Sequence, residues 1–363
     1  MALSALAMVG AVFAGCGSDD DSSSGGSSTT DGGGKAQKVA VLLPDTKSSI
    51  RWESIDRPLV QKAFDDAGVP VEIQNAQGDK SAQQQQAEQA ITNGAKILLL
   101  TNLDSGSGAA IQANAKSRGV KVIDYDRLTL KGSGDYYVSF DNVKVGKLQG
   151  EGLAKCLADG GPATPNIAEL NGSPDDNNAT LFAQGYNSVL DPMYQGGKAT
   201  KVADQAVPDW DNQQALTIFE QMLQKENNNI QGVLAANDGL GNSVISALKA
   251  RKLKQIPVTG QDATPEGIQN ILSGDQCMTV WKPADGEAKA LSDVAIALLK
   301  GDKPKTTGTV KDTEGNRDVK AILLDPISVT KDNLADAISK GAQSVTDVCT
   351  GAYAPMCASA GIK

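Results

Sequence analysis

The sequence predicts an α/β protein of two Rossmann-like βαβ domains with parallel sheets, joined by a three-strand hinge. Its 363 residues are enough for two domains. Short apolar runs alternate with helical stretches, and this alternation occurs twice along the chain. Continuous apolar strands that alternate with helices are typical of parallel sheets covered on both faces.

The two repeats can be followed element by element. In the first, predicted strands cover 38–44, 71–74, 95–100 and 120–125, with helices at 54–67, 81–93 and 108–118. In the second, predicted strands cover 166–170, 199–203, 232–236 and 256–260, with helices at 180–190, 213–224 and 241–250. In open α/β sheets, ligands bind at the carboxyl ends of the strands. Two such edges that face each other would form a cleft.

Later segments are expected to return to both domains. The chain divides near residues 137–142, and segments 278–283 and 323–326 are expected to cross between the domains again. We therefore expect an N-terminal lobe of 38–139 plus 283–323. The C-terminal lobe is expected to contain 140–282 plus 324–363.

The residues before the first strand indicate export. Residues 1–15 are uncharged and apolar, too short to span a bilayer, and end in small residues, as in a signal peptide. Residues 13–16 resemble the lipobox of bacterial lipoproteins, although Phe13 stands where Leu is usual, so Cys16 is expected to be lipidated. Of the 21 residues at 17–37, 18 are Gly, Ser, Asp or Thr, which is typical of a disordered tether. The expected location is the outer face of the cell membrane, or the periplasm, with the lipid anchor as the sole membrane contact.

Composition excludes several classes of function. The net charge of −9 disfavours binding to nucleic acid. The chain contains no histidine, which excludes Ser-His-Asp and Cys-His catalysis and His-ligated metals. No CxxC spacing, complete dinucleotide fingerprint or Walker sequence occurs. We expect no cofactor and no metal, and any ATPase must be another subunit.

Four cysteines remain besides Cys16, and an even number in an exported protein favours two disulfides. Cys349 and Cys357 are eight residues apart and enclose Gly351 and Pro355, which allow the chain to turn back. We expect these two to pair. Cys156 would then pair with Cys277.

Polar side chains and two tryptophans follow the predicted strands. Asp, Asn, Arg and Lys side chains come after at least seven strands, with Trp52 in the first half and Trp210 in the second. Each sugar hydroxyl both donates and accepts, so carboxylates, amides and cationic donors together satisfy it. Aromatic faces cover the apolar C–H faces of a sugar ring. This combination predicts a monosaccharide pocket in the cleft.

The same motifs resemble the type I periplasmic sugar-binding proteins of bacterial ABC transporters, over about residues 38–338. The shared stretches are Arg51-Trp52, Tyr125-Asp126-Arg127, Ser139-Phe140-Asp141-Asn142, Gly172-Ser173-Pro174, Asn237-Asp238, Gly260-Gln261-Asp262-Ala263 and Met278-Thr279-Val280-Trp281-Lys282-Pro283. Trp281 stands where this family usually has Tyr, and residues 347–363 have no counterpart in the family.

The resemblance implies a role for particular residues. Trp52 and Trp210 would sandwich the sugar ring. Its hydroxyls would contact Arg51, Asp126, Arg127, Asp176, Asn178, Asn237, Asp262 and Lys282. The resemblance is closest to the members that bind D-xylose, so a pentose, D-xylose first, is the expected ligand. The expected partners are this sugar and the permease subunits of an ABC transporter, with the protein a monomer.

Three other functions share some of these features. A glycoside-processing enzyme would use Asp126 and Asp262, but neighbouring Arg127 and Lys282 would hold these carboxylates ionised, which suits an acceptor and not a general acid. The sugar-sensing core of a repressor shares the fold. A repressor would have no export signal and would need a basic DNA-binding region, whereas this chain has the leader and no such region. A sugar sensor acting through a membrane receptor remains an alternative. The sequence thus favours a protein that is not an enzyme.

Overall fold

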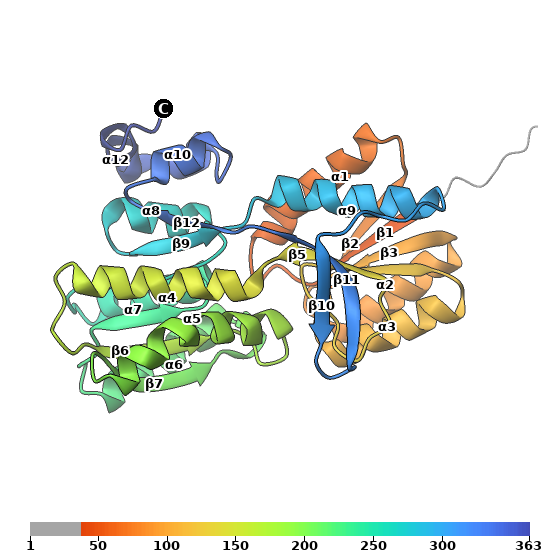
Figure 1. Ribbon diagram of the computed structural model, residues 1–363. Coiled ribbons are helices and arrows are strands. Elements are labelled where there is room, and N and C mark those ends of the chain that lie inside the picture. The colour runs from red at the N-terminus through yellow and green to blue at the C-terminus, as the bar shows by residue number, and fades with distance from the viewer. Residues whose placement is uncertain (1–37) are drawn as a thin grey trace, which may run out of the picture. The chain divides into compact units, whose positions relative to one another are not determined.

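The structure, a computed structural model, describes residues 38–363. A seven-stranded sheet forms the centre of one of its two lobes (Figure 1). The predicted signal peptide, the lipidated Cys16 and the tether lie outside the described residues. The strand order is β10-β11-β5-β4-β3-β1-β2. The first five strands in the chain are β1 (Lys38–Leu43), β2 (Val71–Asn75), β3 (Ala95–Leu100), β4 (Lys121–Tyr125) and β5 (Tyr136–Phe140). All pairs among them are parallel, and the edge hairpin of β10 (Gly308–Asp312) and β11 (Arg317–Leu324) is antiparallel.

Both faces of this sheet are buried under helices, as the apolar strands predict. Val39, Val41 and Leu43 pack against α1 (Arg57–Asp66) and α9 (Ala284–Leu299). The alternate residues Ala40 and Leu42 pack against α2 (Lys80–Thr92) and α3 (Ser105–Ser117). Successive side chains of a strand point to opposite faces, so one apolar run fills both layers. These elements constitute the N-terminal lobe.

The C-terminal lobe is built on a second parallel sheet, of order β7-β6-β8. Its strands are β6 (Asn166–Asn171), β7 (Thr200–Ala206) and β8 (Gly232–Ala235). Its long helices are α4 (Asn142–Ala158), α5 (Asn177–Gln195), α6 (Asn212–Lys225), α7 (Asp238–Ala250) and α8 (Pro265–Ser273). Helix α4 packs along α5, and α6 packs along α7.

A small third layer completes this lobe. Strand β9 (Met278–Trp281) pairs antiparallel with β12 (Ile327–Thr330). The short helices α10 (Leu334–Ser339), α11 (Val345–Val348) and α12 (Ala354–Ser359) follow β12. They share an apolar cluster with α8 and Trp281. The α/β class with mainly parallel sheets is thus confirmed.

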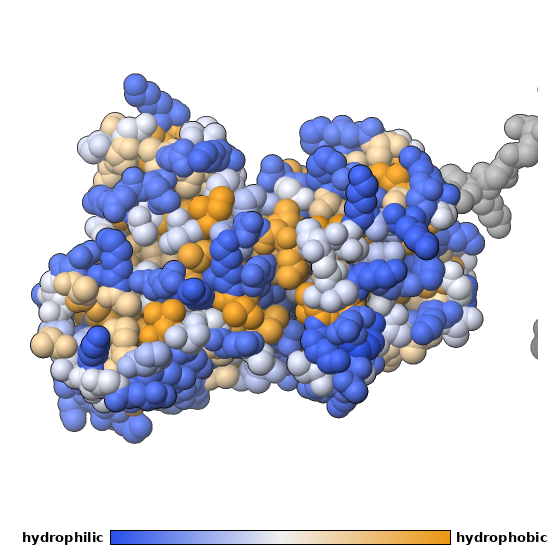
Figure 2. Space-filling model, viewed as in Figure 1, coloured by the Kyte–Doolittle hydropathy of each residue, from blue (hydrophilic) through white to orange (hydrophobic). Residues whose placement is uncertain are grey.

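Three segments connect the two lobes. The chain leaves the seven-stranded sheet after β5 to enter α4, returns from β9 to α9, and leaves again from β11 to β12 (Figure 1). In Figure 2, hydrophobic residues gather in the middle of the view, around these segments, while hydrophilic residues cover much of the rest of that face. Ile327 in β12 is one of the exposed large hydrophobic residues, at 38%.

Some expected elements differ from the structure. The predicted strand at 256–260 makes a single bridge, between Val258 and Val233. Pro257 has no N–H to donate, which shortens the ladder of hydrogen bonds.

Helix α4 is absent from the predicted elements, because Gly146, Gly150 and Gly152 lower its helix propensity. These glycines serve packing: a Cβ on Gly146 would collide with the Phe182 carbonyl oxygen of α5.

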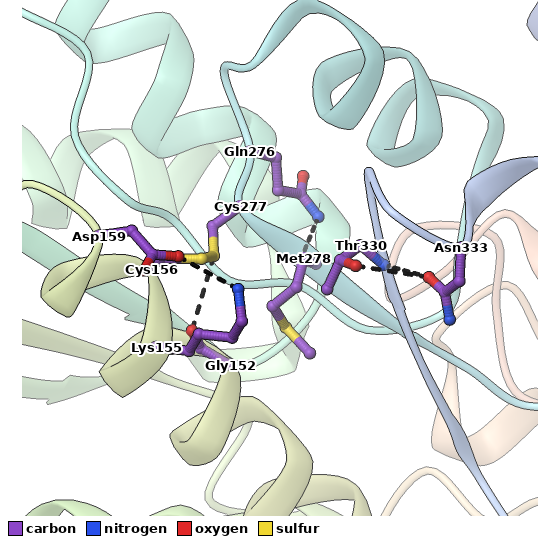
Figure 3. The surroundings of a disulfide bond; sticks show 9 residues. All are labelled: Gly152, Lys155, Cys156, Asp159, Gln276, Cys277, Met278, Thr330 and Asn333. Atoms are coloured by element: carbon purple, nitrogen blue, oxygen red, sulfur yellow. Dashed lines mark hydrogen bonds and ion pairs between the residues drawn. A yellow bond between two sulfur atoms is a disulfide. The ribbon is translucent and has the colours of Figure 1, made fainter. Parts of the chain in front are cut away.

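Both predicted disulfides are present. Cys156, near the end of α4, is bonded to Cys277, which precedes β9 (Figure 3). This bond joins two elements that are 121 residues apart in the sequence. Cys349 is bonded to Cys357 and closes the loop between α11 and α12.

Candidate functional site

All ten residues predicted from the sequence line one pocket between the two lobes. Ser48, Ser49, Phe182 and Gln261 line it with them. The pocket has an empty volume of about 310 Å³. Asp126 and Arg127 follow β4, Asn237 follows β8, and Lys282 follows β9. The carboxyl ends of the parallel strands of each sheet meet at one edge, and the edges that hold β4 and β8 both contribute to the pocket. Lys282 reaches it from β9, which pairs antiparallel with β12.

Arg51 is the centre of a buried charge network in the N-terminal lobe. Its guanidinium donates two hydrogen bonds to Asp56, at 2.7 and 2.6 Å. A third goes to Asp126 at 3.2 Å, and a fourth to Glu287 of α9 at 3.0 Å. Tyr125 also donates to Asp56. Arg51 is only 3% exposed, so these four bonds fix the direction in which its fork points.

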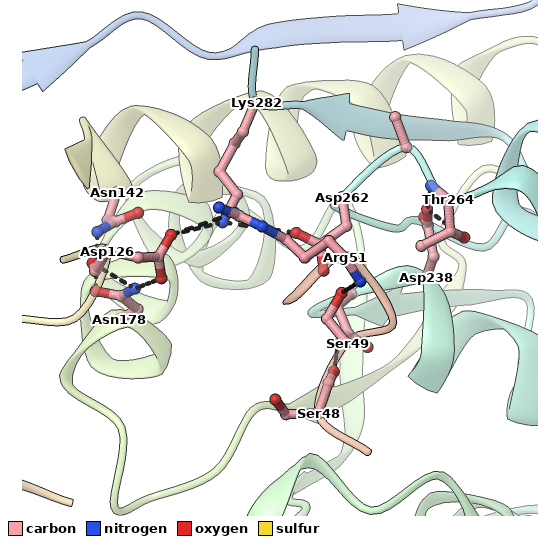
Figure 4. A network of polar contacts seen from close by, with 12 residues as sticks. Ser48, Ser49, Arg51, Asp126, Asn142, Asn178, Asp238, Asp262, Thr264 and Lys282 are labelled. Atoms are coloured by element: carbon pink, nitrogen blue, oxygen red, sulfur yellow. Dashed lines mark hydrogen bonds and ion pairs between the residues drawn. The ribbon is translucent and has the colours of Figure 1, made fainter. Parts of the chain in front are cut away.

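Asp126 is the carboxylate that two cations of the pocket, Arg51 and Lys282, contact directly. One carboxylate oxygen accepts from Arg51 and lies 3.4 Å from Lys282 Nζ, and the other accepts from Asn178 Nδ2 at 3.0 Å (Figure 4). Burial opposes ionisation, but the charges of Lys282, Arg51 and Arg127 hold the Asp126 pKa below its usual value. Asp126 is therefore an ionised acceptor and no candidate for a general acid.

Lys282 connects this carboxylate to the C-terminal lobe. Its Nζ lies 3.5 Å from Asp262 Oδ1 and 3.4 Å from Asp126 Oδ2. Asp262 has a φ of 97° and the next residue, Ala263, a φ of 49°, both in the left-handed region. Asp262 Oδ1 is buried and accepts no hydrogen bond from any residue within 38–363. Apart from the ion pair with Lys282, this oxygen has no partner among the described residues at the wall of the pocket.

The two tryptophans are held by their indole nitrogens. Trp52 Nε1 donates to Ser48 Oγ at 3.1 Å, and Trp210 Nε1 donates to Asp176 Oδ2 at 3.1 Å. Arg51 lies over the Trp52 ring, 4.6 Å from the centroid. Trp210 lies against Gly172, where any Cβ would collide with the indole. A glycine is therefore required at the end of β6 to admit this ring.

Several site residues contact each other across the two lobes. Arg127 Nε lies 3.0 Å from Asp176 Oδ2, and Asn178 Nδ2 also donates to the Asp126 carbonyl. Asn237 Nδ2 donates to the Ser48 carbonyl at 3.1 Å. Asp176 and Asn237 are also the N-caps of α5 and α7, so the starts of these helices point at the pocket.

The supporting residues under the pocket were not predicted as site residues. Glu287 is fully buried in α9 and contacts Arg51, and Asn142 of α4 donates to Asn178 at 2.9 Å. Burial raises the pKa of Glu287 to about 8, against the opposing charge of Arg51. Glu287 lies within α9, so the strand-end pattern carries no signal for it, whereas Asn142 follows β5 by two residues and does carry that signal. Gln261, which precedes Asp262 on the same loop, also carries that signal.

Chemically, the pocket offers carboxylate oxygens, amide groups and cationic donors, and the indole rings of Trp52 and Trp210 both line it. This set satisfies the hydrogen-bonding needs of groups that both donate and accept, as hydroxyls do.

Within residues 38–363, no cluster of three or more Cys, Asp or Glu side chains has a metal-binding arrangement. In the same part of the chain, no helix is long and apolar enough to cross a membrane. The disulfides lie outside the pocket lining.

Comparison with known proteins identifies the family. A family described as "Periplasmic binding protein domain" matches residues 39–303. The D-xylose-binding periplasmic protein of Escherichia coli is 36% identical over 307 residues, which cover 84% of this chain and 90% of that protein. The multiple sugar-binding periplasmic receptor ChvE of Rhizobium radiobacter is 33% identical, over 84% of this chain and 89% of its own.

Solved structures agree with this result. An ABC transporter solute-binding protein from Clostridium phytofermentans with bound β-D-glucose superposes with a TM-score of 0.80 at 30% identity, over 86% of this chain and 100% of the other. A carbohydrate transporter solute-binding protein from Chloroflexus aurantiacus, in complex with D-glucose, gives 0.78 at 29% identity, over 86% and 98%. The chain therefore belongs to the periplasmic binding protein family.

Proposed function

We propose that this protein captures a monosaccharide between its two lobes and delivers it to the permease of an ABC transporter. The observation that carries the proposal is the pocket itself. Two tryptophans, one from each lobe, line the same pocket as a set of carboxylates, amides and cations at the carboxyl ends of both sheets. Its relatives, whose names and titles describe sugar-binding and ABC solute-binding proteins, support the same role.

We propose D-xylose as the first ligand to test. Two indole rings favour a flat ring with apolar faces. An all-equatorial pyranose such as xylose presents axial C–H bonds to both sides and hydroxyls at its edge. Those hydroxyls would meet the carboxylates and amides of the pocket. Two relatives at 36% identity are named D-xylose-binding proteins, whereas two structural neighbours hold glucose, so glucose is the decisive competitor.

We infer that the protein binds the sugar without chemical change. A glycosidase needs one carboxyl group that keeps its proton near neutral pH beside the scissile bond. Asp126 has its pKa lowered by Lys282, Arg51 and Arg127 against the effect of burial. Glu287, whose pKa is raised, lies beneath Arg51 and is absent from the pocket lining. The arrangement supports recognition and release.

Calorimetry of the purified protein with xylose, glucose, ribose and arabinose tests the proposal. We expect xylose to bind most tightly and to raise the unfolding temperature in a concentration-dependent way. Tighter binding of another sugar would change the assigned ligand and leave the proposed function in place. Absence of binding to every sugar, with Trp52→Ala and Trp210→Ala indistinguishable from the wild type, would contradict the pocket assignment.

A second role, as a sugar sensor acting through a membrane receptor, is favoured by one relative that is named a periplasmic receptor. Deletion of the chain separates the two roles. A transport protein is required for uptake of labelled sugar, whereas a sensor is required for the sugar response while uptake continues.

We propose that the chain is exported and held at the outer face of the membrane by a lipid on Cys16. The support is the apolar leader, the lipobox-like residues and the polar stretch that follows. Cys16→Ser is expected to release the protein from the membrane fraction. Mass spectrometry of the wild-type N-terminus would show a diacylated cysteine, and an unmodified residue there would contradict the anchor.

A further inference from the structure

The C-terminal tail, residues 340–363, packs against the loop that carries Asp262. Ala342, Val348, Cys357 and Ile362 share one apolar cluster with Ala263 and Trp281, the residues next to the pocket residues Asp262 and Lys282. The tail also lines a groove with an empty volume of about 1200 Å³, together with Arg51, Asp262 and Lys282. The tail thus lies directly behind one wall of the pocket.

The Asp262 loop has a backbone that must be held in place. Asp262 and Ala263 both adopt left-handed φ values, which non-glycine residues adopt at a cost. On one side, Thr264 N–H donates to Asp238 at 2.7 Å, and Asp238 is fully buried. Ala263 N–H donates to Thr279 Oγ1 at 3.2 Å. These contacts leave the Ala263 carbonyl to be satisfied from elsewhere.

Gln343 of the tail supplies that bond. Its Nε2 donates to the Ala263 carbonyl oxygen at 3.0 Å. The tail is fixed in turn by Gln269 of α8, which donates to the Val348 carbonyl at 3.0 Å, and by the Cys349–Cys357 disulfide. The strained loop is therefore held between Asp238 on one side and Gln343 on the other.

We propose that Gln343 is a positioning residue of the pocket and that the disulfide-closed tail keeps it in place. The Gln343 bond fixes the Ala263 peptide, and this fixes the direction of the neighbouring Asp262 carboxylate, whose buried Oδ1 pairs with Lys282 and accepts no hydrogen bond from residues 38–363. The inference rests on the proposed sugar-binding function. Ligand affinity in this protein then depends on a segment that does not line the pocket itself.

Gln343→Met tests this, because methionine has a similar shape and no N–H donor. The matched control is Gln255→Met, which removes a similar amide bond to the Asp275 carbonyl, away from the pocket lining. Loss of one hydrogen bond predicts that Gln343→Met raises the dissociation constant for D-xylose, or for whichever sugar binds most tightly, roughly two- to tenfold. Gln255→Met should leave it unchanged. The Cys349→Ser/Cys357→Ser variant should weaken binding in the same direction.

A double-mutant cycle separates positioning from general stability. In an Asp262→Ala background, Gln343→Met should have no further effect, because it acts through Asp262. An equal effect in both backgrounds, or a lowered unfolding temperature with unchanged affinity, would overturn the proposal. If Gln343→Met has no effect while Asp262→Ala weakens binding, the proposed function survives and this inference fails.

Hydrogen exchange provides a readout that needs no ligand. The amides of Asp262 and Ala263 donate to the Val280 carbonyl and to Thr279. Gln343→Met should speed their exchange, and Gln255→Met should not. If no sugar binds, the proposed function fails, but faster exchange in Gln343→Met alone would still show that the tail holds the loop. Unchanged exchange would overturn the inference.

Discussion

At the scale of single residues, the pocket is built around a buried network of opposite charges. Arg51, Arg127 and Lys282 face Asp56, Asp126, Asp176, Asp262 and Glu287, all of them buried or nearly so. A buried ion pair loses much of its favourable energy to desolvation, so such a network is poor at stabilising a fold. Its fixed directions are instead suited to orienting hydroxyl groups.

The first prediction concerns the tryptophans. Trp52→Ala and Trp210→Ala should each weaken sugar binding by ~1–3 kcal/mol, if stacking on sugars resembles stacking on bases. Calorimetry measures the change. Tyr194→Ala is the control, because it removes an aromatic ring at the other end of α5, outside the pocket lining. Equal effects of all three variants would argue against stacking.

The second prediction concerns Glu287. Its pKa is raised by burial from 4.5 to about 8, so between these values the folded protein keeps a proton that the unfolded chain has lost. The free energy of unfolding must then fall as pH rises through this range. Buried Asp124 and Asp238, with pKa values raised to about 7, act in the same direction.

Glu287→Gln removes this titration and keeps an acceptor for Arg51. Urea unfolding between pH 5 and 8 should show a shallower decline for the variant than for the wild type. Asp285→Asn is the control, since it changes an exposed carboxylate of the same helix. Identical slopes for Glu287→Gln and the wild type would mean that Glu287 is ionised throughout this range.

The pocket residues that follow strands could be predicted because strand ends are visible as the last residues of apolar runs. Asp126, Asn237 and Lys282 are of this kind. Asn142 also follows a strand, β5, although it was not chosen as a site residue. Glu287 could not be predicted, because it lies within α9 and reaches the site through tertiary packing. The role of Gln343 could not be predicted from a local sequence pattern either, since its partner Ala263 is 80 residues away in the sequence.

At the scale of elements, the contact between α4 and α5 depends on glycine. A Cβ on Gly146 would collide with the Phe182 carbonyl, and one on Gly185 with the Val143 carbonyl. The two backbones therefore approach each other directly. This close approach brings Asn142, at the start of α4, next to Asn178 at the start of α5, and so connects helix packing to the pocket.

The third prediction follows from this contact. Gly146→Ala and Gly185→Ala should each lower the free energy of unfolding by at least about 1–3 kcal/mol, the usual cost of overpacking. Gly308→Ala is the control, because a Cβ there meets nothing within 4 Å. Thermal or urea unfolding measures the difference. Unfolding curves of Gly146→Ala and Gly308→Ala that coincide would contradict the packing described.

Helices and strands could be predicted from the sequence chiefly where no glycine or proline interrupted the hydrophobic pattern. The apolar runs located β1 to β4 and β6 to β8, but not β5, β10 or β11. The glycines of α4 concealed a helix whose stability comes from packing. The apolar run at 256–260 makes only one bridge, since Pro257 interrupts the ladder. Helices α3, α5 and α7 each begin three residues earlier than expected, where Asp104, Asp176 and Asn237 cap them.

At the scale of the whole molecule, three crossing segments make a hinge possible. The contacts that join the lobes at the pocket are polar: Arg127 to Asp176, Asn178 to Asp126, and Asn237 to the Ser48 carbonyl. Polar contacts of this kind exchange readily with water, so they hold the lobes together weakly by themselves. A sugar that contacts both lobes adds interactions available in the closed arrangement alone.

The last prediction is therefore that sugar shifts the protein towards the closed arrangement. Small-angle X-ray scattering should give a smaller radius of gyration with saturating sugar than without it, because hinge closure around a ligand brings two lobes together. Trp210→Ala, at a sugar concentration too low to saturate it, should show a smaller decrease. An unchanged radius in the wild type, under conditions where calorimetry shows saturation, would mean that the lobes are already closed without ligand. The sugar would then enter a preformed pocket, and the polar contacts between Arg127 and Asp176 would be strong enough to hold it shut.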